Sequence, residues 1–353
     1  MVQKFETLIL LITILFLQTN PFGLAVASDL PTVAIVATGG TIAMKVDPRT
    51  GTTVPALSGE DLVSAVPELK QLANIQVVNF SNIPSEYMTP EIWIQLSKKV
   101  DAILSNPDVT GVVITHGTDT LEETAYFLDL TLKSDKSVVC IGAQRSASER
   151  DTDGPRNLLN AVRVVLSKES AGKGVMVILN HYINAAREVR KMHTSNVETF
   201  QSGIYGYLGY VDIDRVVFYR ESIRRQKLAL PAKLPRIDLI AMYTGADGSY
   251  LKYAVDSGAE GIVISAFGIG NINEAMFDAV KYAIAKGIPV VISTRVPTGR
   301  VFPLYGNKGG SATLKEIGAI FSDDLTPSKA RILLMLTLPL TKDHEGLQAY
   351  FDK

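Results

Sequence analysis

The chain has 353 residues, of which 20% are charged, and its formal net charge at pH 7 is -1. This balance gives no electrostatic reason to expect nucleic acid or an anionic membrane as a partner. The length exceeds what one small core usually holds, so two domains are expected. The one cysteine, Cys140, cannot form an internal disulfide and lies in an apolar run, which favours a buried strand residue over a catalytic thiol.

The N-terminus has the three-part layout of a secretory leader. A short basic start at Met1–Lys4 precedes the apolar run Leu8–Leu17, and Ala25-Val26-Ala27 supplies the small residues that a signal peptidase reads. A run of about ten apolar residues is too short to span a bilayer comfortably, and an uncleaved anchor is the alternative. We therefore expect residues 1–27 to be a signal peptide, a mature chain beginning near Ser28, and a periplasmic or secreted protein without a membrane partner after cleavage.

Strand-like apolar runs alternate with helical patterns in the first half of the chain. Near-continuous Val/Ile strands spaced by helices are typical of a parallel sheet that is covered on both faces. The predicted strands are Thr32–Ala37, Ile75–Phe80, Gly111–Thr115, Val138–Ile141 and Val175–Leu179. The predicted helices are Ser58–Leu69, Pro90–Ser105, Thr120–Lys133 and Pro155–Ser167.

The alternation weakens from Thr194 to Pro235 and then resumes, which predicts an antiparallel margin, a linker and a second domain. The later strands are predicted at Ile237–Tyr243, Gly261–Ala266 and Val290–Ser293, with helices at Tyr250–Ser257, Glu274–Ala285 and Ser328–Leu336. The expected fold is α/β. A larger N-terminal domain with a flavodoxin-like parallel sheet takes residues 28–225, a linker 226–235, and a smaller C-terminal α/β domain 236–353.

Several catalytic classes lack their motifs. No G-x-S-x-G elbow and no Walker A sequence are present, and Gly268-Ile-Gly270 lacks the third glycine of a dinucleotide fingerprint. The four histidines form no H-E-x-x-H motif, and there is no Cys/His cluster, so a zinc site is not expected.

Two loops follow predicted strands and carry small hydroxyls beside glycines. They are Ala37–Ala43, which contains Gly39-Gly40-Thr41, and Thr115–Thr120, which contains His116-Gly117-Thr118-Asp119. In a parallel sheet both loops emerge at the carboxyl edge, where open α/β sheets bind ligands. The structural alternative is a tight turn in the first loop and a helix-capping pattern in the second, with Glu122 and Glu123 following Thr118 and Asp119.

The two loops together favour nucleophilic attack on an amide carbonyl. Such a reaction needs an activated nucleophile and a stabilised oxyanion. Asp119 beside Thr118, with a nearby lysine, would form a Thr-Lys-Asp relay, and backbone N–H groups around Gly40 or Gly117 would hold the oxyanion. The residues alone do not decide which threonine attacks.

Both loops resemble the two signatures of the bacterial type II L-asparaginases, in order and at the family's separation. The resemblance implies a homotetramer without a cofactor that hydrolyses L-asparagine to L-aspartate and ammonia through an acyl-enzyme. It covers most of the mature chain and rests on Ile35–Ala43, Ile114–Leu128, Asp153-Gly-Pro155, Arg295-Val-Pro-Thr-Gly299 and Ser328–Leu334.

The resemblance also assigns roles to particular residues. It makes Thr41 the nucleophile and groups Thr118, Asp119 and Lys191 as a second catalytic set, with Asp119 also binding the substrate's α-amino group. Without the resemblance, Lys191 would be interpreted as a solvated helix-end lysine. The resemblance also marks five residues as substrate-binding. Thr118 and Asp119 are two of them, and the others are Ser85, Glu86 and Ala143.

Two departures from the family's pattern stand out. The family's mobile lid carries a tyrosine that supports the nucleophile, but Lys45 to Glu60 has none, and Thr52 falls about where it should be. Family members also lend a carboxylate from a neighbouring subunit, yet Gly299 to Leu314 contains no Asp or Glu. A different residue substitutes at each place, or turnover is weaker.

Three functions stay open from the sequence. The first is an L-asparaginase, and the second is a mixed glutaminase–asparaginase, because one methylene shifts binding by only about 1–3 kcal/mol. The third, from another class, is a periplasmic solute-binding protein, which needs no activated nucleophile.

Overall fold

The computed structural model describes residues 30–353. The predicted signal peptide and its cleavage site at Ala25–Ala27 lie outside the described residues. Over the part of the chain that is described, no helix combines the length and the hydropathy needed to cross a membrane.

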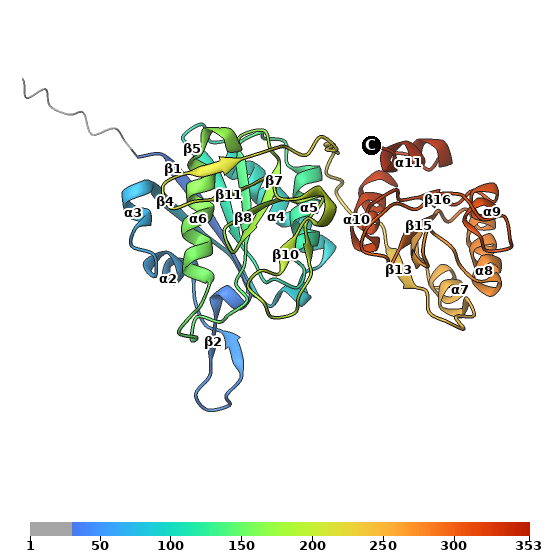
Figure 1. Cartoon of the computed structure of the whole chain (residues 1–353), viewed down its shortest axis with the longest axis horizontal. Helices are drawn as coiled ribbons and strands as arrows, with labels where there is room; N and C mark the ends of the chain where they lie inside the picture. The colour runs from blue at the N-terminus through green and yellow to red at the C-terminus, as the bar shows by residue number, and fades with distance from the viewer. Residues whose placement is uncertain (1–29) are drawn as a thin grey trace, which may run out of the picture. The chain divides into compact units, whose positions relative to one another are not determined.

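The larger sheet has eight strands in the order β12-β11-β8-β7-β6-β5-β1-β4 (Figure 1). Its parallel part runs β4-β1-β5-β6-β7, which is the flavodoxin-like order 2-1-3-4-5. These five strands confirm the predicted ones. Their bounds are Asn74–Ile83 for β4, Thr32–Gly39 for β1, Val109–Thr115 for β5, Ser137–Ile141 for β6 and Val175–Leu179 for β7.

The other three strands add an antiparallel margin beyond β7, so the sheet as a whole is mixed. They are β8 (Tyr182–Ala185), β11 (Gly209–Val211) and β12 (Val216–Phe218). Two short hairpin-like pairs stand apart from this sheet. They are β2 (Met44–Val46) with β3 (Thr53–Pro55), and β9 (Arg190–Lys191) with β10 (Phe200–Gln201).

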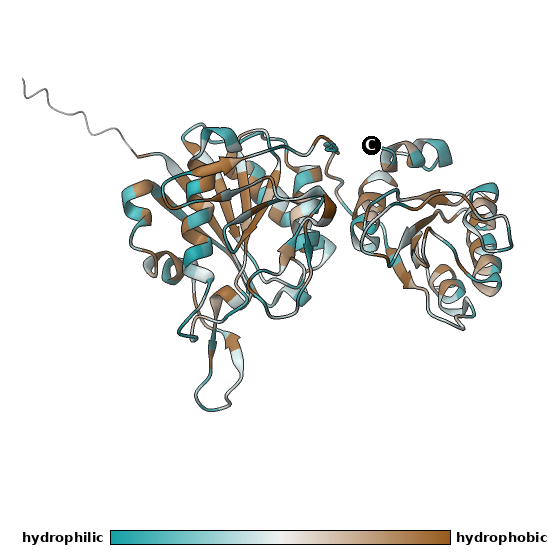
Figure 2. Ribbon diagram, viewed as in Figure 1, coloured by the Kyte–Doolittle hydropathy of each residue, from teal (hydrophilic) through white to brown (hydrophobic). Residues whose placement is uncertain are grey.

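Helices cover both faces of the parallel part, which explains its unbroken apolar strands. Along β1, Ala34 and Val36 belong to one core cluster, whereas Val33 and Ile35 belong to the other. The first cluster includes helices α4 (Pro90–Leu104) and α5 (Leu121–Thr131), and the second includes α2 (Gly59–Ser64), α3 (Leu69–Leu72) and α6 (Gly154–Leu166). Figure 2 shows the strands as mainly hydrophobic and the outer helices as mixed.

The prediction of one helix over Ser58–Leu69 is wrong, because the structure forms α2 and α3 with a break between them. Pro67 lies in the break. A proline ring clashes with a continuing helix and disfavours helical angles at the residue before it, so the helix ends here. Helix α2 itself begins with a capping box between Ser58 and Asp61.

The smaller sheet is parallel throughout and has the order β13-β14-β15-β16. Its strands are β13 (Ile237–Ala241), β14 (Gly261–Ala266), β15 (Val290–Thr294) and β16 (Ile320–Phe321). Its helices are α7 (Ser249–Asp256), α8 (Glu274–Ala285), α9 (Ser311–Glu316), α10 (Pro327–Thr337) and α11 (His344–Phe351). The sequence pattern did not predict β16, α9 or α11.

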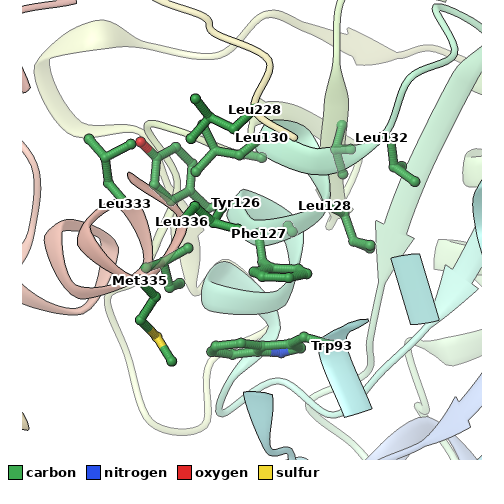
Figure 3. Packing of buried hydrophobic residues seen from close by; sticks show 14 of the residues in the cluster. Trp93, Tyr126, Phe127, Leu128, Leu130, Leu132, Leu228, Leu333, Met335 and Leu336 are labelled. Carbon is green, nitrogen blue, oxygen red and sulfur yellow. The ribbon is translucent and has the colours of Figure 1, made fainter. Parts of the chain in front are cut away.

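Helix α10 contacts both halves of the chain, because it packs on β13 and β14 and also on α5. Leu333, Met335 and Leu336 of α10 join the cluster that contains Tyr126 and Phe127 of α5 (Figure 3). The core of the first half is therefore continuous with that of the second.

Candidate active site

The loops after β1 and β5 emerge at the point where the strand order reverses. The chain leaves β1 toward β4 on one side and leaves β5 toward β6 on the other, while β1 and β5 pair with each other. In open α/β sheets, ligands bind at the carboxyl ends of the strands at such a switch point. Two further loops, after β4 and after β6, emerge at the same edge.

Backbone contact joins the first two loops. Gly40 has a φ of 84°, and a Cβ atom on it would lie 2.2 Å from the Cα atom of Gly117, so only glycine fits. Thr41 follows Gly40 as the first residue of the 3-10 helix η1 (Thr41–Ala43) and is partly exposed. Within residues 30–353 no hydrogen bond occupies its hydroxyl, so this hydroxyl is free to meet a ligand.

The ammonium group of Lys191 connects Thr118 and Asp119. Its Nζ atom donates to Thr118 Oγ1 at 2.9 Å and to Asp119 Oδ1 at 2.6 Å. The Lys191 side chain is 18% exposed, whereas that of Asp119 is 63% exposed, so the carboxylate keeps an open side. The Thr118 hydroxyl accepts one bond here and retains its own proton and a second lone pair for a ligand.

Two structural interpretations of these residues are wrong. Helix α5 has Thr120 as its N-cap residue and no side-chain cap, so neither Thr118 nor Asp119 caps it. Lys191 lies on strand β9 rather than at a helix end, and its side chain is mostly buried.

Glu122 positions Lys191, and the sequence pattern did not predict this role. Its Oε2 atom accepts the backbone N–H of Lys191 at 2.6 Å, and Lys191 pairs with Phe200 of β10. The residues after Asp119 were interpreted as a helix cap. The position of Glu122 in the first turn of α5, next to the second loop, is the one signal that could have indicated a supporting role.

Ser85 lies against the second loop, after β4. It begins the 3-10 helix η2 (Ser85–Tyr87), and its carbonyl oxygen accepts the Thr120 hydroxyl at 2.8 Å. Its Oγ atom lies 2.6 Å from where a Cβ atom on Gly117 would stand. Glu86 is exposed beside it, so both members of the pair are at the same edge.

Ala143 follows β6 directly after Gly142, and Gly142 lies against the second loop, because a Cβ atom on it would come within 2.9 Å of the Thr118 methyl group. Asp153 holds the loop after β6 by accepting the backbone N–H groups of Gln144 and Arg145, each at 3.0 Å. The Asp153-Gly-Pro155 motif therefore supports the loop that contains Ala143.

The family models divide the chain in the same way as the two sheets. The model described as Asparaginase, N-terminal, matches residues 32–224, and that described as Glutaminase/Asparaginase C-terminal domain matches residues 236–351. The chain belongs to the asparaginase family. Membership makes it an amidohydrolase, and its α/β fold with a large mixed sheet and a smaller parallel sheet is the family's fold.

Individual asparaginases are similar over almost their whole length. The chain is 41% identical over 343 residues to the probable periplasmic L-asparaginase of Haemophilus influenzae, covering 94% of this chain and 96% of that protein. It is 40% identical over 335 residues to L-asparaginase 2 of Escherichia coli, covering 93% and 94%. The crystal structure of a probable cytoplasmic L-asparaginase from Campylobacter jejuni superposes with a TM-score of 0.83, at 40% identity, over 91% of this chain and 99% of that one.

Thr52 is the one predicted site residue that the structure does not connect to the others. It lies at the turn of the β2–β3 hairpin, where its hydroxyl bonds to that of Thr50 at 2.7 Å and its carbonyl accepts the N–H of Asp47. Figure 1 shows this hairpin projecting from the sheet.

Across residues 30–353, no group of three or more His, Cys, Asp or Glu side chains could hold a metal ion.

A buried chain of hydrogen bonds fixes the protonation of His116. Trp93 Nε1 donates to Thr124 Oγ1 at 2.9 Å, and Thr124 lies 3.0 Å from His116 Nε2. Because the Gly117 carbonyl, 2.7 Å from Nδ1, can only accept, Nδ1 carries the proton of the neutral ring, and Nε2 accepts the Thr124 hydroxyl. Neutral His116 thus holds the loop that carries Thr118.

We expect His116 to make the free energy of unfolding depend on pH in the acidic range. Burial lowers the pKa of His116 from 6.5 to about 4, so between those values the unfolded chain binds a proton that the folded chain does not. The free energy of unfolding should fall by about 1.4 kcal/mol per pH unit as the pH drops through this window. In denaturant titrations at several pH values, the stability advantage of the wild type over His116→Gln should shrink toward pH 4. An advantage that is constant with pH would contradict this role.

Proposed function

We propose that the chain hydrolyses L-asparagine to L-aspartate and ammonia, with Thr41 as the nucleophile. The observation that carries the proposal is the bridge from Lys191 Nζ to Thr118 and Asp119, in a loop whose backbone touches Gly40. The free hydroxyl and the hydrogen-bonded Thr-Lys-Asp set, on loops that touch, would supply the nucleophile and the activating group that amide hydrolysis through an acyl-enzyme needs. The names of the similar proteins support asparagine as the substrate.

The reaction divides into two steps. The Thr41 oxygen attacks the side-chain amide carbon, and the departing nitrogen takes up a proton and leaves as ammonia. Water then attacks the resulting ester, releasing aspartate and restoring the Thr41 hydroxyl. The Thr118 hydroxyl, which Lys191 polarises, would relay the Thr41 proton to the departing nitrogen in the first step and a proton of the attacking water back to Thr41 in the second.

Of the two glycines expected near the oxyanion, Gly117 is the better candidate. The N–H group of Gly40 already donates to the Ile83 carbonyl at 3.1 Å. Among the described residues no acceptor takes the N–H group of Gly117. A donor without an internal partner is free to hold charge that develops on the substrate oxygen.

Substrate recognition would use the groups around this loop. The open carboxylate of Asp119 is suited to the α-amino group. Ser85, which lies beside Gly117, and its neighbour Glu86 would bind the remaining polar atoms, and Ala143 would lie near the amide. Family analogy favours the second candidate, a mixed glutaminase–asparaginase, because Glu86 stands at a position where family members carry glutamine or glutamate.

Initial rates of ammonia release from L-asparagine, L-glutamine and D-asparagine test the proposal. A pure asparaginase should prefer L-asparagine strongly, whereas a mixed enzyme should use L-glutamine at a comparable rate. A solute-binding protein would release no ammonia from any of them, and its affinity would survive Thr41→Ala.

The hairpin β2–β3 supplies a separate prediction about the lid. We propose that Thr52 replaces the lid tyrosine when the hairpin closes over Thr41. Thr52→Val removes the hydroxyl while keeping the side chain's shape, so acylation measured in single-turnover experiments should slow sharply. The neighbouring exposed Thr53→Val is the matched control. Wild-type rates in the Thr52 variant would show that another group supports the nucleophile.

Export and assembly belong to the same proposal. We propose that residues 1–27 are removed, that the mature enzyme is periplasmic or secreted, and that it forms a homotetramer. The name of the similar Haemophilus influenzae protein supports the periplasm, although the similar Campylobacter jejuni structure is named as cytoplasmic. Intact mass of the exported protein, which should begin at Ser28, and light scattering test these points.

A further inference from the structure

Lys329 of α10 is a fully buried cation that binds backbone rather than a carboxylate. Its side chain has no exposed surface, and within residues 30–353 it makes no ion pair, although its Nζ atom lies 5.9 Å from the centre of the Tyr126 ring. Its Nζ atom donates to the carbonyl oxygens of Arg187, at 3.0 Å, and of Val189. Burial lowers the pKa of Lys329 to about 8, so it is still largely an ammonium at neutral pH. A buried charge is costly unless its donors are satisfied, so these two bonds fix the backbone that supplies them.

Two side chains of the same stretch also bond to the second half of the chain. The Arg187 guanidinium pairs with Asp324 at 2.6 Å, and these side chains are only 6% and 10% exposed. Arg190 Nη1 donates to the Pro297 carbonyl at 3.0 Å. The stretch 187–190 is therefore held at four points by residues 297–329.

That stretch leads directly to Lys191, the residue that connects Thr118 and Asp119. On the side of the first sheet, Glu122 and Phe200 fix the Lys191 backbone. A lysine has a long flexible side chain, so the place of its Nζ atom depends on how firmly its backbone is anchored. A displacement of about 1 Å in a catalytic group can cost roughly 100-fold in rate.

We propose that Lys329 is a positioning residue for Lys191, through which the second half of the chain sets the geometry of the site at the first sheet. The inference rests on the proposed function for its kinetic consequence. The positioning role would also explain why Arg295–Gly299 and Ser328–Leu334 belong to the family resemblance. Neither motif contributes a residue to the Thr41–Thr118 site itself. Pro297 and Lys329, one from each motif, both bond to the stretch before Lys191.

The test compares Lys329→Met with Arg331→Met in the full-length mature protein. Arg331 is on the same helix and also donates to a carbonyl, but that carbonyl belongs to Ile237 of β13, at 2.8 Å. For Lys329→Met we expect kcat on L-asparagine to fall roughly 10- to 100-fold with KM within about threefold, because the change misplaces a group and removes no substrate contact. Arg331→Met should keep kcat within about threefold of the wild type.

A second measurement separates positioning from a general loss of structure. Amide hydrogen exchange of the peptide over 187–191 should speed up in Lys329→Met and stay unchanged in Arg331→Met, while exchange in β5 stays slow in both. Lys329→Gln, whose amide retains donors, should recover part of kcat. It replaces Lys329→Met in all measurements if that variant does not fold.

The outcomes distinguish this inference from the proposed function. Wild-type protein that releases no ammonia from L-asparagine would refute the proposed function, and the exchange measurement would then decide the positioning role alone. Unchanged exchange over 187–191 in the Lys329 variant, or an equal loss of kcat in both variants, would overturn the inference.

Discussion

Replacing Thr41 with alanine is expected to lower ammonia release from L-asparagine by roughly 1,000-fold or more, because the attacking oxygen is lost. The protein should fold as before. Thr41 is partly exposed, and no hydrogen bond of the described residues depends on its hydroxyl, so its removal deletes little packing. Steady-state kinetics and denaturant titration of the same preparation measure both quantities.

Thr32→Ala is the matched control for this experiment. Thr32 begins β1, the same strand that leads to Thr41, but it lies at the opposite edge of the sheet. It should keep activity near that of the wild type. A Thr41 variant with substantial turnover would place the nucleophile elsewhere, and Thr118 would be the next residue to test.

Lys191→Met is expected to have the second-largest effect, a fall in kcat/KM of roughly 100- to 1,000-fold. Methionine keeps the length and apolar stem of lysine but removes the ammonium group that polarises Thr118. Stability should change little, because methionine keeps the packed stem of Lys191 and the ion pair is open to water at Asp119, which is 63% exposed, where such pairs contribute only about 0–1 kcal/mol. Kinetics on L-asparagine combined with thermal unfolding would check both parts.

Lys136→Met controls for the loss of a lysine. Lys136 donates to the Asn106 carbonyl at 2.6 Å, just before β6 and thus at the far edge of the sheet. Its variant should retain full activity. If Lys191→Met were equally active, Lys191 would be a structural residue, and the relay with Thr118 would play no part in catalysis.

The central strands could be predicted because the physics that forms them is visible in the sequence. Strands such as β5 and β6 are buried on both faces and therefore appear as continuous apolar runs. Strands such as β9 and β10 have two residues each and exist only because distant segments meet, so no local pattern predicts them. The prediction of a helix over Ser58–Leu69 was wrong for a local reason. Pro67 interrupts the helix although the apolar residues around it have helical spacing.

The site also has a part that local sequence patterns predict and a part that they do not. Glycine and threonine at the ends of two parallel strands predicted the loops that meet at Gly40 and Gly117. Lys191 is 73 residues from Thr118 in sequence, and only family resemblance placed it there. Glu122 and Asp153 accept the backbone N–H groups of Lys191 and Gln144, contacts for which the sequence has no periodic signal.

The central claim is that Thr41 attacks the substrate beside the Thr118 loop, and trapping the acyl-enzyme tests it most directly. Turnover of L-asparagine would be quenched in acid within milliseconds, and tandem mass spectrometry of the digested protein would locate the aspartyl ester. We predict one aspartyl group, on the Thr41 hydroxyl. An ester on Thr118, or on any residue other than Thr41, would contradict the account.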